Sequence, residues 1–535
     1  MQHRPACTSL VEIILCAKAI MKRKDFILAS GILPFLAKEI KGSPVTNDRP
    51  TNKTAANNRF TSQKDFFYKP ENAWAADFIP LFAEGAFQLF YLLDWRNADK
   101  HGEGTPWYRL TTTDFVNFTE HGEVLPRGGK DEQDLYVFTG SAIKANGKYH
   151  IFYTGHNHHL MDKGQPAQAV MHATSDDLQH WTKIPEHTFF APAGRYEKND
   201  WRDAFVFFND ETKEYNMLLA ARFTKGIPRR RGLTAYCTSK DLVKWDVKEP
   251  FYAPNQFITH ECPDLFKMGD WWYLVFSEYS ELVATRYRMS RSLKGPWLIP
   301  KQDTFDGHAF YAAKTASDGK NRFIFGWNPT KSEEKDSGGW NWGGNLVVHQ
   351  IVQQSNGELS VRVPDTVIKS FNKPVKQTFA AENGDTIGTA TDIEIKAPQK
   401  FQSLVSEEMP ATCMISTVAE FTNGTKDFGC MIRTSDDLDK SYYIRLEPLR
   451  NRLVFDMWPR DKSELNNMVE LERQVELKPN RPILIQVFID GNKGVVYIDN
   501  SVTMNFRAYD FPEGKWGFFA TDGNVRFRNI KLATL

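Results

Sequence analysis

Residues 261–278 read ECPDLFKMGDWWYLVFSE, and this stretch sets the pattern for much of the chain. An acid opens a short apolar strand, the pair Gly269-Asp270 makes a turn, and an aromatic-rich strand returns. Gly and Asp tolerate the positive φ angles that tight hairpin turns require. The stretch therefore predicts a β-hairpin with a carboxylate at the start of its first strand.

The returning strand of this hairpin recurs along the chain at intervals of about 50 to 65 residues. The copies are AFQLFYLLD from Ala86, KYHIFYTG from Lys148, EYNMLLAAR from Glu214, WWYLVFSE from Trp271 and NRFIFGW from Asn321. Each copy follows a turn that contains Gly, Asn or Asp. Four-stranded units at such a period are typical of a β-propeller, whose radial packing protects the sheet edges. We therefore predict a five-bladed β-propeller over residues 66–365. A sixth blade is possible only if it lacks the turn and the aromatic-rich returning strand.

The pattern changes after Pro364. Residues 366–535 hold strands in which apolar and polar side chains alternate, as in Tyr442–Leu446 and Ile483–Ile489, with frequent turns between them. Such alternation favours a β-sandwich. The predicted fold is all-β: a five-bladed β-propeller followed by a C-terminal β-sandwich over residues 366–535.

Residues 1–65 are predicted to be an N-terminal extension. From Met21 a basic start, Lys22 to Lys24, precedes an apolar run from Phe26 to Ala37, which is the layout of an export signal. The segment resembles a twin-arginine signal in which one arginine is a lysine; an N-terminal arm is the alternative. Residues 41–65 are polar and predict a linker. We therefore expect export to the periplasm or the extracellular space, and no membrane span, because no uncharged apolar run reaches about 18 residues.

Composition narrows the class of partner. The chain has 67 Lys and Arg against 66 Asp and Glu, so it carries no strong field for nucleic acid. Aromatic residues make up 13% of the chain, including 14 Trp. They suit strand cores, and indole rings also stack on the apolar faces of sugars. A carbohydrate is the expected partner.

Neither a metal nor a cofactor is expected. The six cysteines form no CxxC pair and show no Cys/His spacing typical of a zinc site. The cluster Gly155-His-Asn-His-His159 could suggest metal ligands, but no carboxylate stands at ligand spacing in the sequence. A solvated loop is the favoured interpretation of this cluster.

Three acids stand at the starts of predicted inner strands, which are the first strands of the blades. They are Asp77, Asp203 and Glu261, in blades 1, 3 and 4. Inner strands run side by side around one axis, so these carboxylates are predicted to form a ring at one mouth of the channel. Their mutual repulsion should raise at least one pKa. A protonated acid beside an ionised one is the pair that glycoside hydrolysis requires.

Several segments around these acids resemble motifs of glycoside hydrolase family 32, which contains invertases, inulinases and levanases. The similar segments are Glu261-Cys-Pro-Asp-Leu, Trp201-Arg-Asp203, Phe138-Thr-Gly-Ser141 and Phe310-Tyr-Ala-Ala-Lys-Thr315 with Gly326-Trp327. The resemblance covers about residues 70–365 as the catalytic propeller and 366–535 as the family's β-sandwich.

The resemblance implies a retaining hydrolase of β-fructofuranosidic bonds in fructans, fructo-oligosaccharides or sucrose. Asp77 would be the nucleophile, Glu261 the general acid/base and Asp203 the stabiliser of the transition state. The residues expected to contact the sugar are Arg202, Trp74, Ser141, Tyr311, Trp107 and Trp342.

The sequence also departs from the family pattern. The usual motif Trp-Met-Asn-Asp-Pro-Asn-Gly is replaced by Trp74-Ala-Ala-Asp77-Phe, which keeps the acid and loses the neighbouring Asn. The third-blade Pro is Ala204. Two alternatives stay open: an inverting furanosidase of the arabinofuranosidase or xylosidase type, and a sugar-binding propeller without activity.

Overall fold

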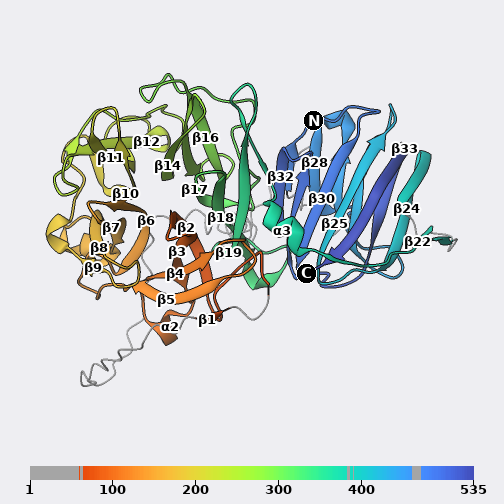
Figure 1. The fold of residues 1–535 in the computed structure, drawn as a ribbon, viewed down its shortest axis with the longest axis horizontal. Coiled ribbons are helices and arrows are strands. Elements are labelled where there is room, and N and C mark those ends of the chain that lie inside the picture. The colour runs from red at the N-terminus through yellow and green to blue at the C-terminus, as the bar shows by residue number, and fades with distance from the viewer. Residues whose placement is uncertain (1–58, 61–63, 382–385, 389–390, 461–470) are drawn as a thin grey trace, which may run out of the picture.

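The computed structural model describes residues 59–60, 64–381, 386–388, 391–460 and 471–535 of the 535-residue chain. The predicted export signal and most of the predicted linker lie outside these residues, so export stays a prediction. Figure 1 shows two all-β bodies side by side, the first coloured red to green and the second cyan to blue. In the described part of the chain, no helix has both the length and the apolar character that crossing a membrane would need.

Within the described residues, the strands of the first body form five antiparallel units, which we call blades 1 to 5. Blade 1 contains β2 (Trp74–Ala83), β3 (Ala86–Asp94), β4 (Trp107–Thr112) and β5 (Thr119–Leu125). Blade 2 contains β6 (Tyr136–Ala145), β7 (Lys148–His156), β8 (Gln168–Ser175) and β9 (Thr182–Lys183). Blade 3 contains β10 (Tyr196–Asn209), β11 (Glu214–Phe223), β12 (Gly232–Ser239) and β13 (Asp246–Val247). Blade 4 contains β14 (Glu261–Met268), β15 (Trp271–Glu278) and β16 (Ala284–Ser290), and blade 5 contains β17 (Tyr311–Ser317), β18 (Arg322–Lys331), β19 (Trp340–Gln353) and β20 (Leu359–Arg362).

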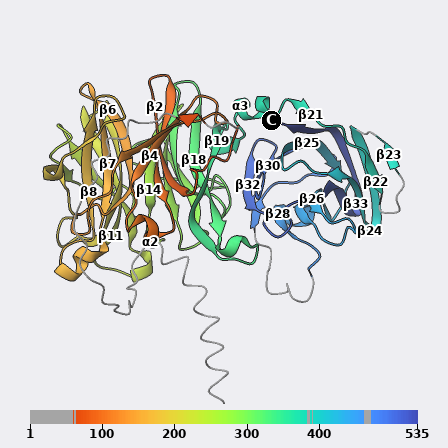
Figure 2. The same ribbon diagram turned by 90° about the horizontal axis from the view of Figure 1, so that it is seen from below.

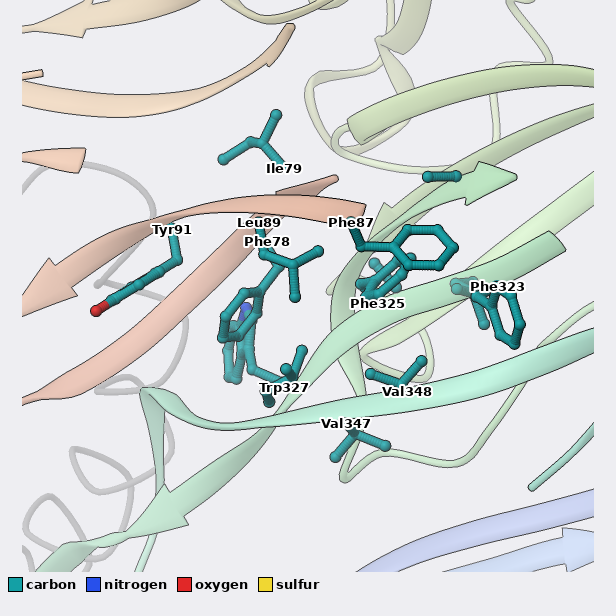
Figure 3. Packing of buried hydrophobic residues seen from close by; sticks show 14 of the residues in the cluster. Phe78, Ile79, Phe87, Leu89, Tyr91, Phe323, Phe325, Trp327, Val347 and Val348 are labelled. Atoms are coloured by element: carbon teal, nitrogen blue, oxygen red, sulfur yellow. The ribbon is translucent and has the colours of Figure 1, made fainter. Parts of the chain in front are cut away.

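The inner strands close a ring. β2 contacts β6, β6 contacts β10, β10 contacts β14, β14 contacts β17, and β17 contacts β2. Blades 1 and 5 are also joined by a backbone pairing between Ala75 of β2 and Gly344 of β19. Aromatic packing supports the same junction: Figure 3 shows Phe87 of β3 against Phe323 and Phe325 of β18, with ring centroids 5.4 and 5.5 Å away. The predicted β-propeller is confirmed.

The propeller begins earlier than its apolar pattern indicates. Strand β1 (Arg59–Phe60) pairs with β5, and the backbone N–H of Asp65 donates to Val116. The prediction that residues 41–65 are a linker is therefore wrong for these last residues. Backbone pairing to an edge strand needs no apolar side chains, so the composition of this segment could not reveal it.

The second body is the predicted β-sandwich, and its strands form one hydrogen-bonded network of 13. The long strand β33 (Lys515–Thr534) connects the layers, because its first part pairs with β26 (Asp427–Thr434) and its second part with β25 (Thr412–Phe421). The other strands are β21 (Lys373–Pro374), β22 (Phe379–Ala381), β23 (Thr386–Gly388), β24 (Asp392–Glu408), β27 (Tyr442–Glu447), β28 (Arg452–Met457), β29 (Leu471–Gln474), β30 (Ile483–Asp490), β31 (Lys493–Ile498) and β32 (Val502–Arg507). A core of side chains such as Ile415, Phe455 and Phe518 fills the space between them.

Helix α3 (Asp365–Ser370) lies at the junction of the two bodies in both views (Figures 1 and 2). The predicted boundary at residue 365 falls at the first residue of this helix; that each body is a domain of its own stays a prediction. Polar groups connect the bodies. Buried Arg507 of β32 donates to Asn328, Pro329 and Asn345 of blade 5.

Candidate active site

Each inner strand carries an irregularity at the same level. The pairing register shifts between Ala76 and Ile79, Phe138 and Gly140, Arg202 and Phe205, Glu261 and Asp264, and Tyr311 and Lys314. Asp77, Asp203, Cys262 and Ala312, each at such a shift, adopt positive φ angles of 42°, 59°, 51° and 50°. A bulge of this kind re-aims side chains, so two consecutive residues of a strand can face the same side.

The bulges divide the site residues into two rows. Asp77, Thr139, Asp203 and Cys262 occupy the bulge position, whereas Arg202, Glu261 and Tyr311 stand one residue earlier in their strands. The repeat predicted that Glu261 lies level with Asp77 and Asp203 in one ring, and the structure corrects this position by one residue. The three acids still converge, since each bulge turns both rows inward.

Asp77 is held by neutral donors. Its Oδ1 accepts the indole N–H of Trp327 at 2.8 Å, and its Oδ2 accepts the hydroxyl of Thr139. The side chain has no ion-pair partner among the described residues, and the residue is 8% exposed. Burial raises the pKa of Asp77 to about 7, and the nearby charges of Asp203 and Glu261 add to this rise.

Glu261 and Asp203 share a cation. Arg202 Nη2 donates to Glu261 Oε1 at 3.1 Å, and its Nε lies 3.7 Å from Asp203 Oδ2. Tyr311 donates its hydroxyl to Glu261 Oε2 at 2.7 Å, and the backbone N–H of Cys262 donates to Asp203 Oδ2 at 3.0 Å. Burial raises the pKa of Glu261 and of Asp203, although Arg202 opposes both rises.

The arrangement can therefore hold protons on some of its carboxyls and not on others. Three buried acids converge and only two of them contact the guanidinium of Arg202, so full ionisation of all three is unfavourable. The Sγ of Cys262 lies 3.9 Å from Asp203 Oδ2, and burial and the charges of Asp203 and Asp77 raise its pKa well above the ordinary value, which keeps the thiol protonated. A nucleophilic cysteine is excluded by this environment.

Of the residues predicted to contact a sugar, the structure brings Arg202, Tyr311 and Trp342 to the acids. Trp342 is partly exposed, and its ring centroid lies 6.4 Å from that of Trp327 and 6.5 Å from that of Phe138. We call Trp327, Trp342 and Phe138 the aromatic rim. It contacts Asp77 through the indole N–H of Trp327.

Trp107 is not brought to the acids, and Ser141 has a structural partner. Trp107 is 0% exposed and packs against Phe90 and Tyr153 between blades 1 and 2, which corrects the expectation that its ring stacks on a sugar. Ser141 is buried, and its hydroxyl accepts the backbone N–H of Val206, so it joins blade 2 to blade 3.

Trp74 occupies an intermediate position. It stands three residues before Asp77, and Lys69 and Arg96 lie over its ring at 5.0 and 4.8 Å. The ring of Trp74 thus already has cationic partners, and its contact with a sugar stays a prediction.

The sequence did not predict which two uncharged side chains donate hydrogen bonds to Asp77. Thr139 belongs to a quoted motif, but only ring closure brings blade 2 beside Asp77. Trp327 is 250 residues away from Asp77 in the chain. No local pattern could have revealed that contact.

The chain is similar to known proteins over most of its length. A family model described as Glycosyl hydrolases family 32 N-terminal domain matches residues 67–361. A beta-fructofuranosidase, insoluble isoenzyme CWINV1, from Arabidopsis thaliana is 23% identical over 508 residues, covering 82% of this chain and 84% of that protein. A sucrose-6-phosphate hydrolase from Zymomonas mobilis is 23% identical over 505 residues, covering 88% and 91%.

Solved structures share the fold. Sucrose-6-phosphate hydrolase from Lactobacillus gasseri has a TM-score of 0.67 at 17% identity and covers 88% of this chain and 93% of its own. Fructan 1-exohydrolase IIa from Cichorium intybus has a TM-score of 0.67 at 16% identity and covers 90% and 97%. Together with the family model, which spans more than half of the sequence, these similarities show that the chain belongs to glycoside hydrolase family 32 and is a β-fructosidase-like glycoside hydrolase.

Proposed function

We propose that this protein is a retaining β-fructofuranosidase that hydrolyses the fructosyl bonds of sucrose, fructo-oligosaccharides or fructans. Asp77 is the nucleophile, Glu261 the general acid/base, and Asp203 with Arg202 binds the sugar hydroxyls and stabilises the transition state. The observation that carries the proposal is that three buried acids converge at the bulges of neighbouring inner strands. Asp77 accepts hydrogen bonds from Trp327 and Thr139, which favour its carboxylate form, and Glu261 accepts from Arg202 and the hydroxyl of Tyr311.

Two converging carboxyls suit a double displacement. The Asp77 carboxylate attacks the anomeric carbon, the bond from that carbon to the glycosidic oxygen breaks, and Glu261 gives its proton to the departing oxygen. A water molecule then gives a proton to Glu261, its oxygen bonds to the anomeric carbon, and Asp77 leaves. Two carboxyls in such roles define retaining glycosidases.

The relatives support the choice of sugar. The relatives include a beta-fructofuranosidase, a sucrose-6-phosphate hydrolase and a fructan 1-exohydrolase, names that describe hydrolysis of fructosyl bonds. Trp342 and Phe138 at the aromatic rim are suited to pack against the apolar face of a leaving sugar.

Product stereochemistry tests the mechanism. The purified protein is given sucrose, inulin, levan and an aryl β-fructofuranoside, and fresh product is followed by proton NMR. We expect release of fructose in the β-furanose form first. Release of the α-form would overturn the retaining mechanism in favour of an inverting enzyme, and binding of the whole panel without cleavage would overturn the catalytic role.

The leaving-group dependence of Glu261→Gln tests the role of Glu261. Loss of the general acid should lower kcat on sucrose by about 10²- to 10⁴-fold. The loss should be smaller on the aryl fructoside, whose phenolate leaves without a proton. Asp264→Asn is the matched control: Asp264 is a buried acid of the same strand that accepts the backbone N–H of Thr315. Equal losses on both substrates would contradict the assignment.

A further inference from the structure

The loops at the outer end of blades 1 and 2 bring a carboxylate to the His156–His159 cluster. Glu103 follows α2 (Ala98–His101) in the connection from β3 to β4. His158 and His159 begin the short helix η1 (His158–Lys163) in the connection from β7 to β8. Glu103 Oε1 lies 3.3 Å from His158 Nε2, and Glu103 Oε2 lies 2.9 Å from His159 Nε2.

These distances suit ligands of one metal ion. The ligand atoms of the three residues all lie within 4.8 Å of one another. Imidazole nitrogens and carboxylate oxygens bind Zn²⁺ at about 2.0–2.2 Å, which puts tetrahedral ligands about 3.3 Å apart. The three side chains are 28–42% exposed, so an ion can enter and water can take the remaining positions.

Both loops are fixed by hydrogen bonds, to β6 of blade 2 and to the connection from β5 to β6. Tyr136 donates its hydroxyl to Glu103 Oε1 at 2.9 Å and so orients the carboxylate. The side chain of Asn157, which is fully buried, accepts the backbone N–H of His159 and donates to the carbonyls of Lys130 and Glu132. Partners of this kind hold metal ligands in place before the ion binds.

His156 has a different role. Its ring stacks on Phe138 at 5.1 Å, so it packs against the aromatic rim. The sequence suggested His156 together with its neighbours, and the missing carboxylate argued against a metal. Glu103 supplies that carboxylate from another blade.

We propose that Glu103, His158 and His159 form a binding site for a divalent transition-metal ion of the zinc class, with water completing its coordination. Nitrogen and oxygen ligands of these types favour Zn²⁺ and its neighbours over Mg²⁺ or Ca²⁺. The ion joins the loops of blades 1 and 2, and Tyr136 connects it to the aromatic rim because it contacts both Glu103 and Phe138. Its role is to hold these loops together, and the proposal does not depend on the proposed function.

Titration of the full chain, purified without a histidine tag and treated with chelator, tests the site. We expect calorimetry to show saturable binding of one Zn²⁺, a rise of the thermal unfolding midpoint with added Zn²⁺, and the visible absorption of four-coordinate Co²⁺ when cobalt is used. Wild-type protein that shows no saturable binding of either ion would overturn the proposal.

Variants assign the binding to these residues. His158→Ala/His159→Ala should abolish binding, and Tyr136→Phe, which removes only the orienting hydroxyl, should weaken it by about 10- to 100-fold. His180→Ala is the matched control, because His180 is an exposed histidine whose Nδ1 lies 2.7 Å from Asp177 and which belongs to no group of three possible metal ligands among the described residues. Binding that survives in the double variant, or that is lost in His180→Ala, would overturn the assignment. Circular dichroism of each variant verifies that it is folded.

Discussion

The propeller and the sandwich both bury acids, but they pair them differently. In the sandwich, Arg445 lies 3.7 Å from Asp427, 2.8 Å from Glu447 and 3.0 Å from Asp456. Arg452 and Arg460 add further ion pairs to Glu447 and Asp456. In the propeller, Asp203 and Glu261 share Arg202, which also contacts Asp200, and Asp77 has no cation in contact among the described residues.

Burial by itself does not distinguish the two sets. It raises the pKa of Asp427 and Asp456 in the sandwich as it raises the pKa of the propeller acids. The difference lies in the supply of cations. A network in which every acid contacts an arginine can stay ionised and stabilise a fold. The three propeller acids have fewer cations, so the group as a whole can keep a proton for acid–base catalysis.

The largest expected effect is on turnover by Asp77→Asn. The amide cannot attack the anomeric carbon, so kcat should fall by about 10³-fold or more. Stability should not fall, since the change removes a buried charge that has no cation. Steady-state kinetics and thermal unfolding measure both. Substantial turnover, or a clear loss of stability, would show that Asp77 is a structural acid like those of the sandwich.

The next effect is on stability, by Arg445→Met in the sandwich. The change leaves several buried acids short of a cation and should lower the free energy of unfolding by about 3–5 kcal/mol. The kcat of the folded protein should stay unchanged. Denaturant titration and kinetics below the transition measure these quantities. Arg450→Met is the control, because Arg450 is exposed and Glu447 is its one ion-pair partner among the described residues, so its loss should cost under about 1 kcal/mol.

The smallest effect is a displacement of the pH profile by Trp327→Phe. The indole N–H stabilises the Asp77 carboxylate and lowers a pKa that burial has raised to about 7. Without this donor the pKa rises further. Because the nucleophile acts as a carboxylate, the acid limb of kcat/KM should move to higher pH. At pH values below the limb, the rate should fall about 10-fold if the limb moves by about one pH unit.

A control separates this effect from the loss of an indole in general. Trp107→Phe changes a tryptophan whose N–H has no partner in the described structure, so it should leave the acid limb in place. If both variants move the limb equally, the bond from Trp327 does not tune Asp77.

The repeated hairpins could be predicted from the sequence because each depends on residues that are close together in the chain. An aromatic strand, a turn with Gly, Asn or Asp and a return strand need only neighbouring residues, so five copies predicted five blades and placed three acids near one mouth. The alignment of Glu261 was one residue off, since a bulge leaves no mark in hydrophobic periodicity. Trp107 was misplaced because both faces of a blade are packed, and hydrophobic periodicity cannot tell a ring that faces the channel from one that lies between blades.

The sequence by itself determined the all-β class, the repeated hairpins and the identity of the acids, since hairpin turns and alternating strands depend on contacts close in the chain. Only the tertiary structure decided which acid has a cation. Trp327 reaches Asp77 across 250 residues, and Glu103 reaches His158 across two blades, because ring closure brings them together. The chemistry of a carboxyl depends on such neighbours, whose charge and hydrogen bonds set its pKa.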